Sequence, residues 1–395
     1  MMKPEIISKF SGVASAAVLA VALQGCGSED EPDSNRSAVI ANYAEIVHAS
    51  YEDSLELALE LDDAVATLVA EPSEISLDTA RERWVEAREP YLQTEVYRFY
   101  DGPIDNPDDG PEGLINAWPL DENYIDYVEG DPSAGIINDP SVEIDAATLE
   151  SLNEQGSEKN IATGYHAIEF LLWGQDLNEA GPGERPHTDY VVGEGGTAEN
   201  QDRRGRYLTA VSEHLVGNLE RLVAAWEPGE DNYRAEFESA PSDDGLSRML
   251  TGMIILSGFE TGGERLQAAL ETGDQEDEHS CFSDNTHRDM IQDIQGVSNV
   301  WHGTYTRLDR SRVSGESLSD LVRKEDAALA DALDQQIAES LRLANELEVP
   351  FDQEIRTDNL EGQARVTALI DSLGVQEELL QDVFALFDLE VPADP

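Results

Sequence analysis

Apolar residues recur every three to four positions along nearly the whole chain, and this period is the strongest constraint on the fold. The most regular stripe consists of Leu318, Val322, Leu329, Leu333, Ile337 and Leu341, and similar stripes occur in 39–68, 207–226 and 370–383. Side chains at this spacing share one face of an α-helix, whereas strand residues alternate with a period of two. No run of β-branched residues bounded by hairpin turns is evident in the sequence. The pattern therefore predicts an all-α protein built from packed helical bundles.

Two segments rich in Gly, Pro, Asp and Asn interrupt the helical pattern, at residues 101–122 and 174–204. A chain of 395 residues is long enough for two domains. We expect a first helical domain over 36–190 and a second over 191–395, with the long loops near their interface. A weak similarity between "GYHAIEFLLWG" and "GVSNVWHG" suggests an internal duplication in which one copy kept a polar pair.

Residues 1–25 have the pattern of a signal peptide. Lys3 and Lys9 bound a short positive region, and an apolar run over 10–23 follows it that is too short for a typical transmembrane helix. The run ends in "LQGC", which resembles a bacterial lipobox. This resemblance implies cleavage before Cys26, lipid attachment to that cysteine and a polar tether over 26–35. An ordinary secretory signal is the alternative, and both interpretations predict export.

The residue after the predicted lipidation site bears on localisation. Gly27 follows Cys26, and by the usual sorting rule for such lipoproteins a residue other than Asp favours the outer membrane. We therefore expect a lipid anchor in the membrane facing the periplasm, in the outer membrane rather than the inner one. The other cysteine, Cys281, then has no intramolecular partner, so the exported chain must fold on a full-sized core without a disulfide.

The charge of the chain is strongly acidic, with 83 Asp and Glu against 25 Lys and Arg and a formal net charge of -58. Such a surface repels nucleic acids, so no nucleic-acid partner is expected. The composition is typical of adaptation to high salt, where solvated carboxylates repel one another less because the salt screens them. The net charge alone does not indicate a metal site.

The stretch "IATGYHAIEFLLWGQD" places two ionisable residues, His166 and Glu169, in the most apolar helix of the chain. Residues three apart lie on the same face of a helix, and Trp173 shares that face. A helix that is apolar all round is buried, and a buried carboxylate needs a polar partner or a cation. Two interpretations follow: half of a metal site, or a hydrogen-bonded His–Glu pair in a polar core. The spacing differs from HExxH, in which two imidazoles lie one turn apart.

Further ligands could come from two other helical stripes. In "RERWVEAREPYLQTEVYRF", Glu95 and Arg98 fall on the inward face, and in "MLTGMIILSGFETGGER" Glu264 does the same, next to Arg265. These carboxylates could reach a metal, or they could form ion pairs, Glu95 with Arg98 and Glu264 with Arg265. Both alternatives fit the spacing.

The acidic stretch 273–289, "GDQEDEHSCFSDNTHRD", embeds Cys281 and an aromatic residue among small polar residues, which suggests a loop that folds back into a pocket. No G-x-S-x-G elbow, P-loop or dinucleotide fingerprint is present. The predicted metal ligands are His166, Glu169 and Glu95, and the predicted lining residues are Arg98, Trp173, Glu264, Arg265, Ser280, Phe282, Ser283 and His287.

Several of these segments together resemble a known family. "GYHAIEFLLWGQD" is similar to the GxHxxE signature of the imelysin family, and "TEVYRFYDGPID", "INAWPLDENYIDYV", "DRRGRYL", "GERLQAAL" and "DEHSCFSDNTH" resemble its iron-regulated protein A-like branch. The resemblance covers about residues 36–390. It implies two helical bundles, export, a link to iron uptake and a site near the GxHxxE helix between the domains. The family takes its name from a peptidase, so it also implies a possible metallopeptidase.

The sequence is therefore consistent with two alternative functions. The first is an exported lipoprotein that binds iron, or an iron-bearing ligand or partner, for uptake across the outer membrane; imidazole and carboxylate ligands suit iron, which we expect over zinc. The second is a metallopeptidase in which the His–Glu pair holds a metal that activates water. No residue can be assigned as base or oxyanion donor, so no catalytic residue is predicted and the sequence favours binding. A surface lipoprotein whose polar pair serves only the core is a third possibility.

Overall fold

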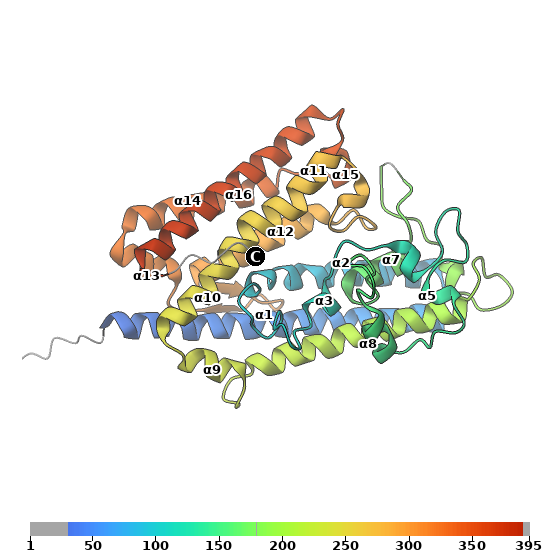
Figure 1. Ribbon diagram of the computed structural model, residues 1–395, viewed down its shortest axis with the longest axis horizontal. Helices are drawn as coiled ribbons and strands as arrows, with labels where there is room; N and C mark the ends of the chain where they lie inside the picture. The colour runs from blue at the N-terminus through green and yellow to red at the C-terminus, as the bar shows by residue number, and fades with distance from the viewer. Residues whose placement is uncertain (1–30, 179, 390–395) are drawn as a thin grey trace, which may run out of the picture.

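The computed structural model describes residues 31–178 and 180–389 and consists of two stacked layers of helices (Figure 1). The predicted all-α class is confirmed. The main helices are α1 (Glu31–Ala70), α2 (Glu74–Leu92), α7 (Gly164–Trp173), α8 (Gln201–Trp226), α9 (Tyr233–Ser239), α10 (Ser242–Ile255), α11 (Ala268–Thr272), α12 (Thr286–His302), α13 (Leu318–Glu325), α14 (Ala327–Ala344) and α16 (Leu360–Leu386).

Short elements occupy the connections. They are α3 (Glu112–Ile115), α4 (Glu122–Ile125), α5 (Gly135–Asn138), α6 (Ala146–Leu152), α15 (Phe351–Ile355), the 3₁₀ turns η1 (Glu95–Tyr97), η2 (His187–Tyr190) and η4 (Gln275–Asp277), and the strands β1 (Thr304–Thr306) and β2 (Arg312–Ser314). The two strands form an antiparallel hairpin in which Tyr305 pairs with Val313. This hairpin was not expected from the helical period.

The predicted signal peptide and Cys26 lie outside the described residues. The predicted tether is partly different from expectation, because α1 begins at Glu31 and so includes residues 31–35. None of the helices in the described part of the chain is long and apolar enough to cross a bilayer.

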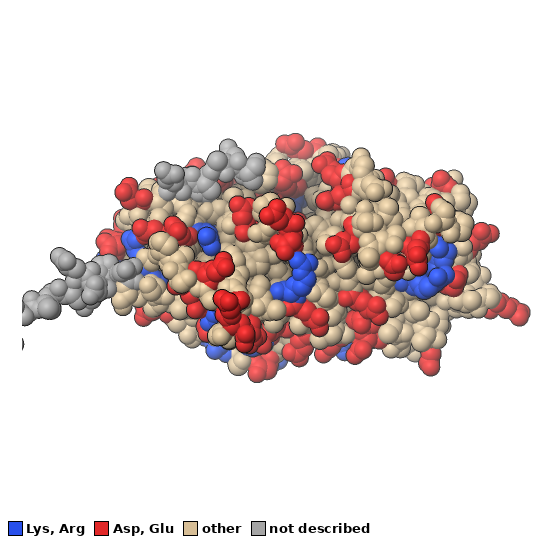
Figure 2. Space-filling view, turned by 60° about the horizontal axis from the view of Figure 1, so that its bottom comes forward, with Lys and Arg blue, Asp and Glu red and all other residues tan. Residues whose placement is uncertain are grey.

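The long helix α1 runs the length of the lower layer and contacts α2, α8, α10 and α13 (Figure 1). Its inward stripe includes Tyr43, Val47, Leu61, Val65 and Leu68, all buried. The principal core spans both layers, while a smaller apolar cluster that includes Leu266, Met290, Phe351 and Leu369 fills the far end of the upper layer. Carboxylates are spread over the face shown in Figure 2, with few basic residues between them.

The predicted domain boundary between 190 and 191 does not coincide with a change of layer. Helix α8, assigned to the second domain from the sequence, packs on α1 and α7 in the lower layer, and α9 also contacts α1. The chain passes to the upper layer only with α10 (Figure 1). Although the polar loop before α8 is long, the apolar face of α8 packs against helices of the first half of the chain.

The upper layer contains one continuous helix over 242–272, in which α10 passes into the π-helical segment η3 (Leu256–Gln267) and then into α11. Gly262 and Gly263 do not break it. A π-helix bonds residue i to i+5, so it changes which side chains share a face. The predicted stripe over 318–341 is instead divided at Asp326, whose side chain accepts from Ala328 N and Leu329 N, both at 3.0 Å, to begin α14.

The two layers approach closely where α12 crosses the end of α2. A Cβ atom on Gly296 would lie 2.5 Å from the carbonyl oxygen of Gln93, so only glycine allows this contact without a shift. A Cβ on Gly374, in the middle of α16, would meet nothing within 4 Å. Both glycines lie within helices, so substitution at Gly374 is a control for substitution at Gly296.

Gly296→Ala should destabilise the protein by about 1–3 kcal/mol because the added methyl group overlaps backbone. Gly374→Ala should stabilise it by about 0.5–1 kcal/mol because alanine loses less conformational entropy in a helix. Denaturant unfolding of both variants beside the wild type measures the difference. Equal effects of the two substitutions would show that α12 does not approach Gln93 this closely.

Candidate functional site

Helix α7 is buried along its whole length, and its start depends on Gly164. This glycine has φ of +84°, and a Cβ there would lie 2.5 Å from the carbonyl oxygen of Ile115. The helix is fixed laterally because Trp84 Nε1 donates to the carbonyl oxygen of Tyr165 at 2.9 Å. The glycine of the GxHxxE motif therefore allows the backbone contact that places the next two turns in the interior.

His166 and Glu169 bond to each other on this helix. His166 Nδ1 lies 2.9 Å from Glu169 Oε2, and both side chains are buried. The other carboxylate oxygen, Oε1, accepts from Ser283 N at 3.0 Å and from Ser283 Oγ at 2.6 Å. The predicted pair thus exists, and its carboxylate is held by a loop more than a hundred residues further along the chain.

A second imidazole lies on that loop. His279 Nδ1 is 2.7 Å from Asp289 Oδ2, and the same oxygen accepts from Ser280 Oγ at 2.5 Å. Asn285 Nδ2 donates to Asp289 Oδ1 at 3.2 Å, and Arg88 forms a 3.4 Å ion pair with Oδ2. The carboxylate of Asp289 therefore joins α2, the loop 278–285 and α12.

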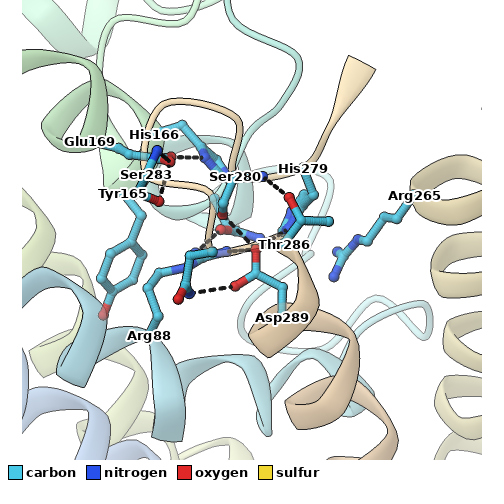
Figure 3. Close-up of polar contacts among 12 residues, drawn as sticks. Arg88, Tyr165, His166, Glu169, Arg265, His279, Ser280, Ser283, Thr286 and Asp289 are labelled. Carbon is cyan, nitrogen blue, oxygen red and sulfur yellow. Dashed lines mark hydrogen bonds and ion pairs between the residues drawn. The ribbon is translucent and has the colours of Figure 1, made fainter. Parts of the chain in front are cut away.

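The two imidazoles meet edge to face. The ring centroids of His166 and His279 are 4.9 Å apart at an interplanar angle of 72°. Figure 3 shows the two rings approaching from α7 and from the loop, with Arg265 reaching toward them from a different helix. His166 Nε2 is buried and has no hydrogen-bond partner among the described residues. The Nδ1 atom of each ring is thus hydrogen-bonded to a carboxylate, and Nε2 of His166 is buried without a partner among the described residues.

Burial and two guanidinium groups keep both imidazoles neutral. Burial lowers the pKa of His166 well below its usual value, and Arg88 and Arg265 lower it further. Burial, followed by Arg265, lowers the pKa of His279 to about 3. Burial opposes ionisation of Asp289, but Arg88 and the bond from His279 bring its pKa below the usual value. His279 therefore donates Nδ1–H to an ionised carboxylate, which leaves its Nε2 as an acceptor.

Burial has the opposite effect on Glu169, raising its pKa to about 8 despite the bonds from Ser283. At neutral pH the pair then keeps a proton between Oε2 and Nδ1, and the second exchangeable proton is at Nε2. If a cation binds at Nε2, one proton must leave the pair. The unpartnered Nε2–H of His166 can equally donate a hydrogen bond to an acceptor atom of a bound anion.

The predicted ligand Glu95 lies in an adjacent ion-pair network. Its Oε2 is 2.7 Å from Arg98 Nη1 and 2.6 Å from Arg265 Nη2, which is the ion-pair alternative that the sequence left open. Arg265 also pairs with Asp293 at 2.7 Å and with Glu260 at 3.0 Å. The carboxylate of Glu95 is therefore committed to two arginines.

The other predicted lining residues divide into two groups. Ser280 and Ser283 are part of the hydrogen-bonded site, and Phe282 packs on Phe170 beside it, with ring centroids 5.2 Å apart. Trp173 lies at the end of α7 against Trp84, at 5.3 Å, where it faces surface grooves.

Two predicted residues lie elsewhere. Glu264 is exposed on η3, and among the described residues it forms no ion pair with Arg265, which pairs with Glu95. His287 is half-buried with an unpartnered Nδ1 and makes no bond to the His166 pair.

Four contributors were not among the predicted site residues: Arg88, His279, Asn285 and Asp289. Arg88 was detectable, because it lies on the same helical stripe as Trp84 and Glu95. His279 and Asp289 stand in the acidic stretch, but no local pattern distinguishes them from its solvated carboxylates.

A metal ion fits these residues only in part. Among residues 31–178 and 180–389, no group of three or more His, Cys, Asp or Glu side chains is arranged to hold a metal ion. The predicted set of His166, Glu169 and Glu95 is not such a group, because both carboxylates face other partners. What the site does offer is a buried Nε2 whose ring is oriented by a carboxylate, which is the arrangement found behind metal-bound histidines.

The comparisons with known proteins agree with this fold. The model of the Imelysin family, peptidase M75, matches residues 47–380. The chain is an imelysin-family protein. This imelysin-family chain is 26% identical over 343 residues to Iron-regulated protein A of Synechococcus elongatus, covering 83% of the chain and 82% of that relative.

Two solved structures share the fold of this imelysin-family chain. One, described as an iron-regulated protein A precursor from Parabacteroides distasonis, matches with a TM-score of 0.70 and 21% identity over 90% of this chain and 95% of the other. The second, an Imelysin-like protein from Psychrobacter arcticum, has a TM-score of 0.63 and 13% identity, covering 91% and 98% of the two chains.

The raised pKa of Glu169 makes a pH-dependent prediction for the metal-free protein. Its folded pKa of about 8 exceeds the ordinary value of 4.5, so the stability it contributes is complete below about pH 4.5 and is lost as pH rises through about 8. Glu169→Gln keeps the bonds of the protonated form. The unfolding midpoint of this variant relative to wild type should therefore rise between pH 6 and pH 9 in the presence of a chelator.

The matched control is Glu194→Gln, which removes one charge from an exposed position. Its midpoint difference from wild type should not show the same rise with pH. A flat difference for Glu169→Gln would mean that the buried carboxyl titrates as an ordinary glutamate.

Proposed function

We propose that this imelysin-family protein binds iron, or an iron-bearing ligand, at the paired imidazoles of His166 and His279. The observation that carries the proposal is that each ring has Nδ1 bonded to a carboxylate, at 2.9 Å and 2.7 Å, while the rings lie 4.9 Å apart. A carboxylate behind an imidazole fixes the tautomer and orients the opposite nitrogen toward a ligand. Neutral imidazoles suit iron, and iron supplies vacant coordination positions for the ligand's own donor atoms.

The limited number of protein donors favours an ion that arrives with its own ligands. A catalytic zinc site in a hydrolase uses three protein ligands and a water, whereas this site offers two imidazoles. Arg88 and Arg265 stand close enough to lower the pKa values of the histidines. Guanidinium groups in this position favour an anionic chelate over a bare cation. The name of the relative from Synechococcus elongatus, Iron-regulated protein A, also supports a link to iron.

A metallopeptidase is the second candidate, because the matched family model bears the name of a peptidase family. One observation in the site favours it: Glu169 has a pKa of about 8, which is suitable for general acid–base chemistry near neutral pH. Against it, both oxygens of Glu169 are already bonded, to His166 and to Ser283. Binding is therefore the better-supported function.

Export and membrane attachment belong to the same proposal. The lipobox-like "LQGC" supports lipidation of Cys26 and anchoring to a membrane facing the periplasm, in the outer membrane rather than the inner one. A protein anchored there could receive iron from, or pass it to, an uptake partner in that membrane. The solved relative from Parabacteroides distasonis is itself described as a precursor.

The test is metal binding by the purified protein, with Fe²⁺ and ferric citrate as probes. Wild type should bind one iron per chain. His166→Ala should abolish binding, and Glu169→Gln should weaken it by about 10–100-fold because it removes the carboxylate that orients the ring. The control is His302→Ala, which removes an exposed imidazole and should leave binding unchanged.

Two results would change the conclusion. If wild type binds neither probe at micromolar concentration, or if His166→Ala binds as well as wild type, the imidazole pair is not an iron site. If the metal-loaded protein cleaves an unfolded polypeptide and His166→Ala does not, the metallopeptidase replaces the binding protein as the function.

A further inference from the structure

Seven buried carboxylates outside the imidazole site have no hydrogen-bond partner among the described residues at one or both oxygens, and four of them, Asp176, Glu278, Asp284 and Asp352, lie near one another. Glu278 is fully buried and Asp176, Asp284 and Asp352 are at most 8% exposed. Both oxygens of Glu278 and of Asp284 have no partner among the described residues, and neither do Asp176 Oδ2 and Asp352 Oδ1. Acidic surfaces of salt-adapted proteins place carboxylates in solvent, so they do not account for buried ones.

These carboxylates come from three separate segments that meet at one place. Asp176 follows α7, Glu278 and Asp284 belong to the loop before α12, and Asp352 lies on α15. The first two segments are joined directly, since Gln275 Nε2 donates to the carbonyl oxygen of Asp176 and Gly183 N donates to that of Phe282 at 2.9 Å. In Figure 1, α15 lies at the end of the upper layer that faces the loops around α7.

The carboxylates are close enough to repel one another. Burial, then Asp176 and Asp352, raise the pKa of Asp284 to about 7. Glu278 lies close to Asp284 and Asp352, and both of its carboxylate oxygens are buried. A group of this kind is destabilising unless a counter-charge or protons neutralise it.

The cluster borders a groove in the surface on one side. A groove of about 620 Å³ opens beside it, and Asp176 and Asp352 are part of its wall. Its other polar walls include Asp274, Glu276, Asp358 and Arg356. An acidic groove therefore meets the cluster at Asp176 and Asp352.

We infer that Asp176, Glu278, Asp284 and Asp352 bind a hydrated divalent cation, for which Mg²⁺ is the appropriate probe. The unpartnered oxygens come from four side chains, but no three of them are arranged to hold an ion directly. Mg²⁺ keeps several of its waters and commonly uses only one or two protein carboxylates. Waters of the ion would supply the hydrogen bonds that the remaining oxygens lack.

A cation here would fasten the loop that builds the imidazole site. Glu278 and Asp284 flank His279, Ser280 and Ser283, the residues that bond to Asp289 and Glu169. By joining this loop to the segment after α7 and to α15, the ion would hold the loop between the two layers. The inference is independent of what binds at His166.

The test is a calorimetric titration of the purified, chelator-treated protein with MgCl₂ at pH 8 in 1 M NaCl, which suppresses diffuse binding to the acidic surface. Wild type should show one saturable site and a rise of the unfolding midpoint with Mg²⁺. Glu278→Gln combined with Asp284→Asn should bind at least tenfold more weakly and lose the rise. Without Mg²⁺ its midpoint should equal or exceed that of wild type, because buried unpaired charges are gone, and this shows that it folds.

The control is Glu194→Gln with Glu220→Gln, which removes the same charge from exposed positions and should bind Mg²⁺ like wild type. His166→Ala should also bind normally, which separates this site from the proposed iron site. The inference is overturned if wild type shows no saturable Mg²⁺ binding, or if the buried double variant binds as well as the exposed one.

Discussion

The carboxylate of Asp289 is the interaction on which the rest of the site depends. It is fully buried and receives His279, Ser280, Asn285 and Arg88, which come from the loop before α12, from the start of α12 and from α2. An ionised carboxylate in the interior is stable only when such donors surround it, and removing them would leave an uncompensated charge. The same requirement forces a polar loop to fold inward between two helical layers.

Once that loop is in place, it completes the polar chemistry of α7. Ser283 supplies both donors to Glu169 Oε1, and His279 brings the second imidazole to His166. Helix α7 is otherwise apolar, so Glu169 obtains its second set of hydrogen bonds from a segment more than a hundred residues away. The same loop carries Glu278 and Asp284, which lie near Asp352 of α15, so both proposed ion sites involve one short stretch of chain.

The sequence predicted the helices and the burial of the His–Glu pair, because both follow from local periodicity. It did not predict the boundary between layers, since the stripe of α8 could have packed on either half and only tertiary contacts decide. Glu264 was placed inward by counting 3.6 residues per turn from Met253 and Glu260. The π-helical turns of η3 change that count, so Arg265 faces Glu260 at i+5 and Glu264 turns to solvent. The partners of Asp289 are non-local, and no single-sequence pattern carries that information.

In the proposed function, His166 Nε2 is the atom that contacts the ligand, with Glu169 behind the ring and His279 beside it. Anomalous diffraction at the iron absorption edge, from crystals of the protein grown with ferric citrate, tests this directly. If iron binds as proposed, a peak should lie within coordination distance of His166 Nε2, on the side where His279 approaches. A peak coordinated by the carboxylates of Glu169 and Glu95 instead, or no peak at the two imidazoles, would contradict it.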